Sequence, residues 1–436
     1  MARLPPFGSH LPWAEPSWYN GRPTPYYNES HVRLRDAMRK WTQENISTDK
    51  LEDWETAGKV PNEMYEKCAS DGLVVPIAFG ARIPAQYSNY PIIGNISPSE
   101  WNGFHDFILW DELFRSGALA SVFIGLVVGA PPLKQYASQA LQDKIFPEIL
   151  TGKKRICLAI TEPSCGSDVK ALTTTAEKTP DGKHYVVNGE KKWITNGMYS
   201  DYFMTAVRTG GPGAGGISML LIPRLPGIRT RPIKVGGGGL SATTFVMFED
   251  VKVPAEYLIG KEGEGFMYTM SNFNHERLWI VFQALRACRV CLEDTMAWVQ
   301  QREAFGKTLI EQPVVRYRFG TMARKVESLQ AWTEQIIFEL EHLSAEEGGK
   351  LLGGITAMLK VEAGQACKHV ADTCAMLMGG LGLTTTGLGA RVEALSRSAN
   401  TLIVPGGSED VLTDLGVREA LKTSKAAEKA RGKAKI

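Results

Sequence analysis

The chain has 436 residues, of which 44% are hydrophobic and 22% charged, with a formal net charge of +2. This length exceeds one ordinary hydrophobic core, so we expect two or three domains. The longest apolar stretch, 118–130, is too short for a membrane span and runs into Pro131-Pro132. Seven cysteines without a secretory signal peptide indicate a reducing compartment with free thiols. The seven histidines show no metal-ligand spacing, so we expect no metal site.

The net charge hides an asymmetry between the last residues and the rest of the chain. Residues 422–436 hold six basic side chains against one acidic, Glu428, so this tail carries +5. Because the total is +2, the remainder carries −3 and offers no basic face for nucleic acid.

The basic tail has two interpretations. One is a disordered extension. The other rests on its end, Ala434-Lys435-Ile436, a small–basic–aliphatic tripeptide of the type that directs peroxisomal import. The N-terminal stretch 1–25 is rich in Pro and Trp and does not read as an Arg-rich amphipathic mitochondrial presequence, so we expect a peroxisomal location before the mitochondrial alternative.

Hydrophobic periodicity divides the chain into an α+β order of helices, strands and helices. Residues 1–30 lack periodicity and are predicted to form an extended arm, followed by a helical domain over 31–154. Residues 155–264 predict an antiparallel β domain, and 265–421 a helical domain before the tail 422–436. The predicted strands are 156–160, 172–177, 185–187, 202–207, 217–222 and 243–248. The predicted long helices are 266–302, 314–345, 350–378 and a shorter one ending near residue 420.

Two patterns resemble known motifs but lack the context that those motifs need. Gly211-x-Gly213-x-x-Gly216 has the spacing of a dinucleotide fingerprint, yet the residues after it read as a strand and not as a helix. We therefore expect a hairpin loop there. Cys288-x-x-Cys291 lies inside a helical pattern without a second pair, so we expect core positions.

Two polar segments each adjoin an apolar strand. The first reads Thr-Glu-Pro-Ser-Cys-Gly-Ser-Asp over 161–168, and the second Asn-Gly-Glu-Lys-Lys-Trp-Ile-Thr-Asn-Gly over 188–197. Backbone N–H groups and small hydroxyls at such an edge suit the heteroatoms of a planar ligand, and the Trp193 indole suits its apolar face.

These segments resemble the T-E-P-x-x-G-S-D and G-x-K-x-W-I-T-N signatures of the acyl-CoA dehydrogenase family, and the resemblance covers about residues 35–420. It implies a C-terminal four-helix bundle, bound FAD and a role in fatty-acid β-oxidation. The implied reaction is α,β-dehydrogenation of an uncharged acyl-CoA, in which a base removes the α-proton and the β-carbon passes hydride to flavin N5. The implied electron acceptor is an electron-transfer flavoprotein or oxygen.

The catalytic base departs from the commoner family pattern, which places a glutamate near the C-terminus. Here that stretch reads Ile-Val-Pro-Gly-Gly-Ser-Glu-Asp over 403–410, and the base position falls on Pro405 or Gly406. A branch like the isovaleryl- and long-chain acyl-CoA dehydrogenases has its glutamate on the first helix after the β domain, before Arg-Leu. Glu276-Arg277-Leu278 matches that pattern, so Glu276 is the predicted base. The competing candidate, Glu409, also reads as a first-turn helix residue.

The resemblance also implies that a backbone N–H of this stretch donates to the thioester oxygen, and Gly406 is preferred to Pro405 because proline has no N–H. By resemblance, Ser167, Asn274 and Arg277 contact the substrate. Arg302 in Arg-x-x-Phe-Gly implies a flavin site shared between subunits, hence a homodimer or homotetramer. The residues implied to contact the cofactor are Leu158, Ile160, Thr161, Gly166, Ser167, Trp193, Ile194, Thr195, Arg302, Phe305, Gln312, Met376, Gly379, Gly380, Gly407, Ser408 and Glu409.

The chain departs from the family pattern at two of the positions expected to contact the cofactor, because Met376 and Pro313 stand where the family has glutamines.

Two alternatives remain open at the level of function. One is a short flavin oxidase that uses oxygen. The other is a catalytically inactive binding protein of the same shape.

Overall fold

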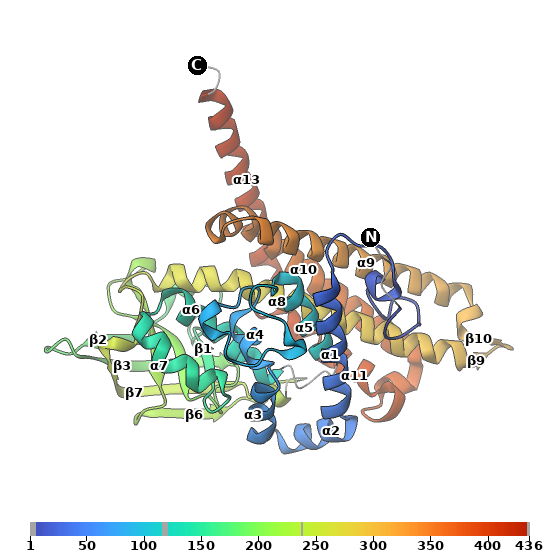
Figure 1. Ribbon diagram of the computed structural model, residues 1–436, viewed down its shortest axis with the longest axis horizontal. Helices are drawn as coiled ribbons and strands as arrows, with labels where there is room; N and C mark the ends of the chain where they lie inside the picture. The colour runs from blue at the N-terminus through green and yellow to red at the C-terminus, as the bar shows by residue number, and fades with distance from the viewer. Residues whose placement is uncertain (1–5, 116–120, 237–238, 434–436) are drawn as a thin grey trace. The chain divides into compact units, whose positions relative to one another are not determined.

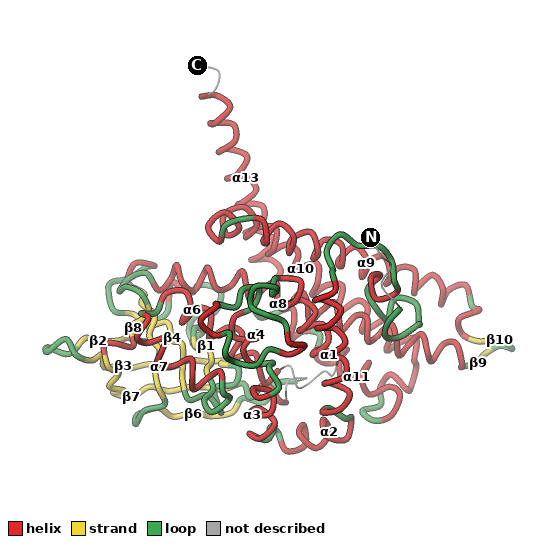
Figure 2. Tube along the Cα trace, viewed as in Figure 1, coloured by secondary structure: helices red, strands yellow, loops and turns green. Residues whose placement is uncertain are grey.

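The computed structural model describes residues 6–115, 121–236 and 239–433 (Figures 1 and 2). Two compact units make up the chain. Unit 1 comprises Met1–Val32, Phe107–Gly117 and Arg277–Ile436, and unit 2 comprises Arg33–Asp106 and Ala118–Glu276. Among the described helices, none combines the length and apolar character that crossing a membrane requires.

The helices before the sheet match the helical pattern predicted for residues 31–154. They are α1 (Glu29–Asn45), α2 (Thr48–Ala57), α3 (Asn62–Ser70), α4 (Val74–Phe79), α5 (Gly103–Arg115), α6 (Ile124–Tyr136) and α7 (Gln139–Leu150). Only the short 3-10 turns Ala85–Tyr87 and Ile93–Asn95 interrupt the loop between α4 and α5. In unit 2, α6 lies directly on the first strand of the sheet, because a Cβ at Gly125 would stand 2.5 Å from the carbonyl oxygen of Ile156.

The sheet of unit 2 contains eight strands, drawn in yellow in Figure 2. They are β1 (Ile156–Ala159), β2 (Thr175–Lys178), β3 (His184–Ile194), β4 (Tyr202–Arg208), β5 (Ile217–Pro223), β6 (Ile228–Pro232), β7 (Thr244–Pro254) and β8 (Leu258–Ile259). Their order is β6-β7-β3-β2-β4-β5-β8, with β1 paired to β4.

Most strand pairs are antiparallel as predicted, but the sheet is mixed, because β1 and the end of β2 run parallel to β4. Neither is joined to β4 by a hairpin, so no tight turn imposes an antiparallel arrangement. The prediction also missed β6 and β8. β6 is mostly exposed and carries Arg229, Arg231 and Pro232, which mask the usual alternation of a strand. The segment with the dinucleotide-like glycines joins β4 to the antiparallel β5, which confirms the predicted hairpin.

Unit 1 contains a bundle of long helices, as predicted: the part of α8 (Gly265–Gln301) that begins at Arg277, together with α9 (Pro313–His342), α10 (Ala345–Met378) and α13 (Glu409–Lys433). The short helices α11 (Ala390–Ser398) and α12 (Asn400–Ile403) connect α10 to α13, and the strands β9 (Glu303–Ala304) and β10 (Lys307–Thr308) connect α8 to α9. Cys288 and Cys291 are buried, which confirms their predicted core positions.

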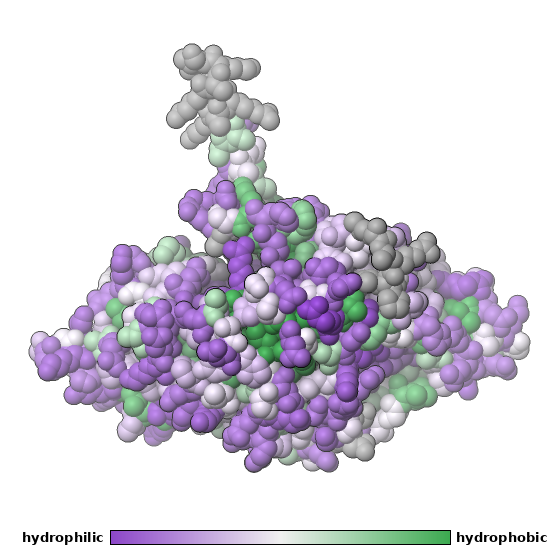
Figure 3. All heavy atoms as spheres, viewed as in Figure 1, coloured by the Kyte–Doolittle hydropathy of each residue, from purple (hydrophilic) through white to green (hydrophobic). Residues whose placement is uncertain are grey.

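The basic tail is helical, so the interpretation as a disordered extension is wrong for residues 422–433. Helix α13 continues to Lys433 without a break, because Lys and Ala dominate this stretch and both favour helix. Val417 and Leu421, on α13 just before this extension, are half exposed. Figure 3 shows green apolar atoms among purple hydrophilic ones on the helix that projects from the molecule. The tripeptide Ala434-Lys435-Ile436 lies outside the described residues.

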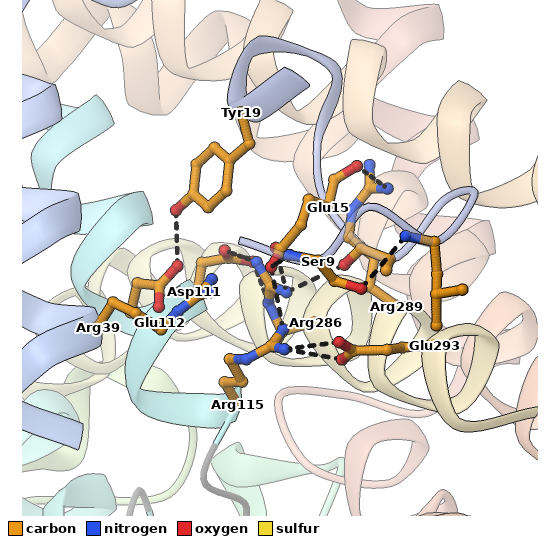
Figure 4. Close-up of polar contacts among 12 residues, drawn as sticks. Ser9, Glu15, Tyr19, Arg39, Asp111, Glu112, Arg115, Arg286, Arg289 and Glu293 are labelled. Atoms are coloured by element: carbon orange, nitrogen blue, oxygen red, sulfur yellow. Dashed lines mark hydrogen bonds and ion pairs between the residues drawn. The ribbon is translucent and has the colours of Figure 1, made fainter. Parts of the chain in front are cut away.

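The N-terminal segment is more folded than the predicted extended arm. It contains a 3-10 turn at Ser17–Asn20, and Glu15, Trp18 and Tyr19 are buried within unit 1. Glu15 forms ion pairs with Arg286 (2.9 Å) and Arg115 (3.2 Å), as Figure 4 shows. The segment therefore contributes buried charge to the core, which its irregular sequence pattern did not indicate.

Candidate active site

The two polar segments of the sequence lie side by side in unit 2. The Lys191 ammonium donates to the carbonyl oxygen of Ile160 (3.0 Å), and the backbone N–H of Lys192 donates to that of Thr161 (2.8 Å). The loop that leaves β1 is thereby fixed along the end of β3. A ligand bound at this edge would therefore contact both segments.

Glu162 is the centre of this arrangement. Its buried carboxylate accepts hydrogen bonds from the backbone N–H groups of Thr173 (2.6 Å) and Thr174 (2.9 Å), and it pairs with Lys191 at 2.8 Å. Burial opposes its ionisation, but the Lys191 charge and the hydrogen bonds outweigh burial and lower the pKa of Glu162 to about 2. The carboxylate therefore holds the loop in place as an anion at neutral pH.

Trp193 is turned outward by a local break in strand pairing. The register between β3 and β7 shifts between Lys191 and Ile194, and Trp193 has φ +64°, in the left-handed region. The indole is 51% exposed while Ile194 next to it is buried. The Lys192 ammonium lies 4.7 Å from the centre of the indole ring. A β-bulge of this kind re-aims a side chain, here toward solvent.

Asn196 ties the end of the second segment to the start of α6. Its side-chain oxygen accepts from the backbone N–H of Gly125 (2.6 Å), and its nitrogen donates to the carbonyl oxygens of Ser121 (3.1 Å) and Ser241 (3.0 Å). All of its side-chain hydrogen-bonding groups thus meet backbone. We expect this anchor to keep the Trp193 turn rigid.

The open edge that results fits FAD. Thr161 and Thr195 are half buried, Gly166 and Ser167 are exposed, and a Cβ at Gly166 would meet nothing within 4 Å. Leu158 is half buried, and Ile160 is buried below the edge. Exposed hydroxyls and backbone beside an open indole are the groups that a planar, polar heterocycle needs. Thr161, Ser167, Trp193 and Thr195 are therefore available to hold a flavin ring.

Two hydrogen bonds fasten the turn of α8 before Glu276 to α6, and two prolines in α6 explain them. Pro131 and Pro132 have no N–H, so the carbonyl groups of Val127 and Val128 lack the helical hydrogen bonds that these residues would otherwise donate. The Asn272 amide donates to the carbonyl oxygen of Val128 (2.8 Å), and His275 forms a hydrogen bond to the backbone of Val127.

His275 reaches this position by lying against Gly80, where a Cβ would stand only 2.9 Å from the ring. Burial, reinforced by the charge of Lys134, lowers the pKa of His275 to about 4. The imidazole next to the predicted base is therefore neutral at pH 7. Glu276 itself is half buried and is the last residue of unit 2.

In unit 1, buried cations hold the segment 403–408, which runs from the last residue of α12 to the residue before α13 and is called the C-terminal loop below. The Arg277 Nε donates to the carbonyl oxygen of Gly406 (3.0 Å), and the Lys360 ammonium donates to that of Gly407 (2.8 Å). Gly406 and Gly407 have φ +70° and +111°, and a Cβ at Gly407 would stand 2.6 Å from Leu412. Two consecutive residues with positive φ explain the glycine pair.

The residues after this loop begin helix α13, in agreement with the prediction that Glu409 is a first-turn helix residue. The carbonyl oxygen of Ser408 accepts from the Leu412 N–H (3.0 Å), and Glu409 is the first helical residue. The Glu409 carboxylate accepts a hydrogen bond of 3.3 Å from Gln365. Its position therefore has a structural explanation that needs no catalytic role.

Comparison with known proteins identifies the chain. Models of the N-terminal, middle and C-terminal domains of acyl-CoA dehydrogenase match residues 28–153, 157–251 and 263–421. The chain belongs to the acyl-CoA dehydrogenase family. This family consists of FAD-binding enzymes, and the two signature segments lie within the residues matched to its middle domain.

Relatives and solved structures agree with this assignment over nearly the whole chain. The acyl-CoA dehydrogenase apdG of Emericella nidulans is 45% identical and covers 98% of this chain and 99% of its own. The acyl-CoA dehydrogenase AFT10-1 of Alternaria alternata is 36% identical, over 95% of this chain and 97% of its own. The crystal structure of acyl-CoA dehydrogenase from Geobacillus kaustophilus has a TM-score of 0.81 at 27% identity, covering 91% of this chain and 100% of that one.

The remaining residues that the family resemblance singled out lie in unit 1, between α8 and α9 and at the end of α10. Phe305 is 98% exposed with φ +55°, and Met376 is 72% exposed. Gln312 donates to the carbonyl oxygen of Ala304 (3.4 Å). Arg302 is exposed, and Gly379 and Gly380 have open space where a Cβ would lie. Phe305 and Met376 are thus two large apolar side chains of unit 1 that lie open to solvent.

Proposed function

We propose that this acyl-CoA dehydrogenase oxidises an uncharged acyl-CoA to the 2-enoyl-CoA with Glu276 as the base. One observation carries the assignment of the base: Arg277, the next residue after Glu276, binds the carbonyl oxygen of Gly406 in a loop that has no carboxylate at position 405 or 406. The only carboxylate of that loop region with a catalytic interpretation, Glu409, is explained by its place at the start of α13.

The chain's own residues then have defined tasks. Glu276 takes the α-proton, and the Gly406 N–H donates to the thioester oxygen as negative charge develops there. Ser167, Asn274 and Arg277 contact the substrate, and Thr161, Ser167, Trp193 and Thr195 hold the flavin ring. FAD, when bound, supplies the acceptor for the β-hydrogen. The proposed acceptor for the electrons that follow is an electron-transfer flavoprotein.

We further propose a homodimer or homotetramer in which Arg302, Phe305, Gln312 and Met376 meet the cofactor bound by another subunit. The exposed Phe305 and Met376 support this arrangement, since isolated apolar side chains of this size gain stability when covered. Light scattering of the FAD-loaded protein tests it. A monomer with full FAD content would refute the shared site.

Anaerobic mixing with a panel of acyl-CoA esters of different length and branching tests the reaction. We expect at least one ester to bleach the flavin absorbance, with no peroxide released when the same mixture turns over in air without a protein acceptor. Stoichiometric peroxide would favour the oxidase alternative. Tight binding of acyl-CoA without bleaching would favour the inactive binding protein.

A further inference from the structure

Lys360 is a buried lysine of α10 that binds the C-terminal loop on both sides of Gly406. Its side chain is almost inaccessible, and its ammonium donates to the carbonyl oxygens of Ile403 and Gly407, the latter at 2.8 Å. These two carbonyl groups flank the tripeptide Val404-Pro405-Gly406. A single charged group therefore holds the loop before and after the residue to which we assign the oxyanion donor.

The face of α10 that carries Lys360 is shaped for this contact. Gly364 lies one helical turn further along the same face, and a Cβ there would stand 3.1 Å from the Ile403 side chain. The absence of that Cβ lets the end of α12 approach α10 closely enough for the Lys360 ammonium to reach the Ile403 carbonyl group. Burying an ammonium group is costly unless hydrogen bonds compensate it, and the two loop carbonyls do so.

The loop needs this support because of its own sequence. Gly406 and Gly407 both have positive φ, and glycine pairs lose more conformational entropy on ordering than other residues. Arg277 holds the carbonyl oxygen of Gly406, and Lys360 holds the residues on either side. Together they leave the peptide between Pro405 and Gly406, whose N–H is the proposed donor, in a fixed orientation.

We propose that Lys360 is a positioning residue for the Gly406 N–H, and that its buried positive charge favours the developing charge on the thioester oxygen. This inference rests on the proposed function, because it assumes that Gly406 is the oxyanion donor. Lys360 does not touch the reacting atoms. It acts through the loop carbonyls, and a cation in a water-excluded site stabilises a nearby negative charge more than it would in water.

The test compares Lys360→Met, which keeps the length of the side chain without charge or donors, with Lys360→Gln, which keeps donors without charge. Lys368→Met is the matched control, since Lys368 lies on the same helix and pairs with Asp372 away from this loop.

FAD content and the midpoint of thermal unfolding show whether each variant is folded. Anaerobic stopped-flow then separates the limiting rate of flavin reduction from the dissociation constant of the best acyl-CoA of the panel. Cinnamoyl-CoA serves as an optical probe, because its absorption shifts to the red when its carbonyl group is polarised.

We expect Lys360→Met to retain FAD and acyl-CoA binding but to reduce flavin about 10- to 100-fold more slowly, less than the roughly 10²- to 10³-fold typical for complete loss of an oxyanion donor. The red shift of bound cinnamoyl-CoA should be smaller in Lys360→Met than in the parent, intermediate between these two proteins in Lys360→Gln, and unchanged in Lys368→Met.

A parent-like rate and red shift in Lys360→Met would overturn the role of Lys360 and leave the proposed function intact. Loss of folding in both Lys360 variants would show a structural role alone. If none of the acyl-CoA esters in the panel reduces the flavin of the parent protein, the proposed function is refuted, and this inference is refuted with it.

Discussion

Lys191 and Glu162 form a buried ion pair, with 2.8 Å between the ammonium nitrogen and the carboxylate oxygen and side chains that are 0% and 1% exposed. The pair joins strand β3 to the loop after β1, and these are the two segments in which we propose the flavin contacts. The same carboxylate also binds the backbone at Thr173 and Thr174. We therefore expect FAD binding and the stability of unit 2 to be coupled through this ion pair.

Breaking this pair should destabilise the protein and weaken FAD binding together. Glu162→Gln leaves the Lys191 charge buried without its counter-ion, which typically costs about 3–5 kcal/mol of unfolding free energy. Urea unfolding with and without added FAD measures the effect. Glu177→Gln, an exposed position on β2, is the control and should change little. Equal stability of Glu162→Gln and Glu177→Gln would contradict this account of the pair.

The same carboxylate predicts a specific dependence of stability on pH. The pKa of Glu162 is about 2 in the folded chain, against an ordinary value of 4.5. Its contribution is therefore complete above about pH 4.5 and is lost as the pH falls from there toward 2. The difference in unfolding free energy between the parent and Glu162→Gln should be constant near neutral pH and shrink below pH 4.5. A difference that grew on acidification would have the wrong sign.

The N-terminal segment should contribute to the stability of unit 1 through its acidic residue. Glu15 contacts both Arg286 and Arg115 in the cluster of Figure 4, and Arg286 also binds Asp111. Glu15→Ala removes a buried counter-ion, so we expect a loss of about 3–5 kcal/mol. Thermal unfolding compares it with Glu249→Ala, which breaks only the exposed pair with Arg229 and should be nearly silent. Similar melting midpoints for the two variants would contradict the predicted contribution of Glu15 to the stability of unit 1.

The tail makes a prediction about location in the cell. We propose peroxisomal import through Ala434-Lys435-Ile436, which follow a helix that continues to Lys433. A reporter fused to the last dozen residues should enter peroxisomes, and removal of the three residues should abolish this. Replacing Lys429 and Arg431 instead, which keeps the tripeptide, controls for charge alone. A reporter that stays cytosolic or enters mitochondria would refute the proposal.

Sequence patterns predicted the succession of helices, sheet and bundle well, because long segments with helical period and short alternating strands are local signals. They failed where tertiary contacts decide. The parallel pairing of β1 with β4 and the buried place of Glu15 depend on residues far apart in the chain. In the site, the motifs predicted Trp193 as a flavin contact. The structural roles of Glu162, Lys191 and Asn196 were not predicted, because they depend on partners elsewhere in the chain. The role of Asn272 had a local signal, since two prolines in α6 leave backbone carbonyl groups that need another donor.

The central claim is that Glu276 removes the α-proton. The direct measurement is the anaerobic rate of flavin reduction by a saturating acyl-CoA in Glu276→Gln, alongside Glu409→Gln as the matched control. Both variants should keep FAD and bind the ester. The account predicts that Glu276→Gln reduces flavin about 10²- to 10⁴-fold more slowly than the parent, since general base catalysis is worth that much, while Glu409→Gln stays near the parent rate. Near-parent reduction by Glu276→Gln, with the loss falling on Glu409→Gln instead, would contradict the account and assign the base to the C-terminal loop.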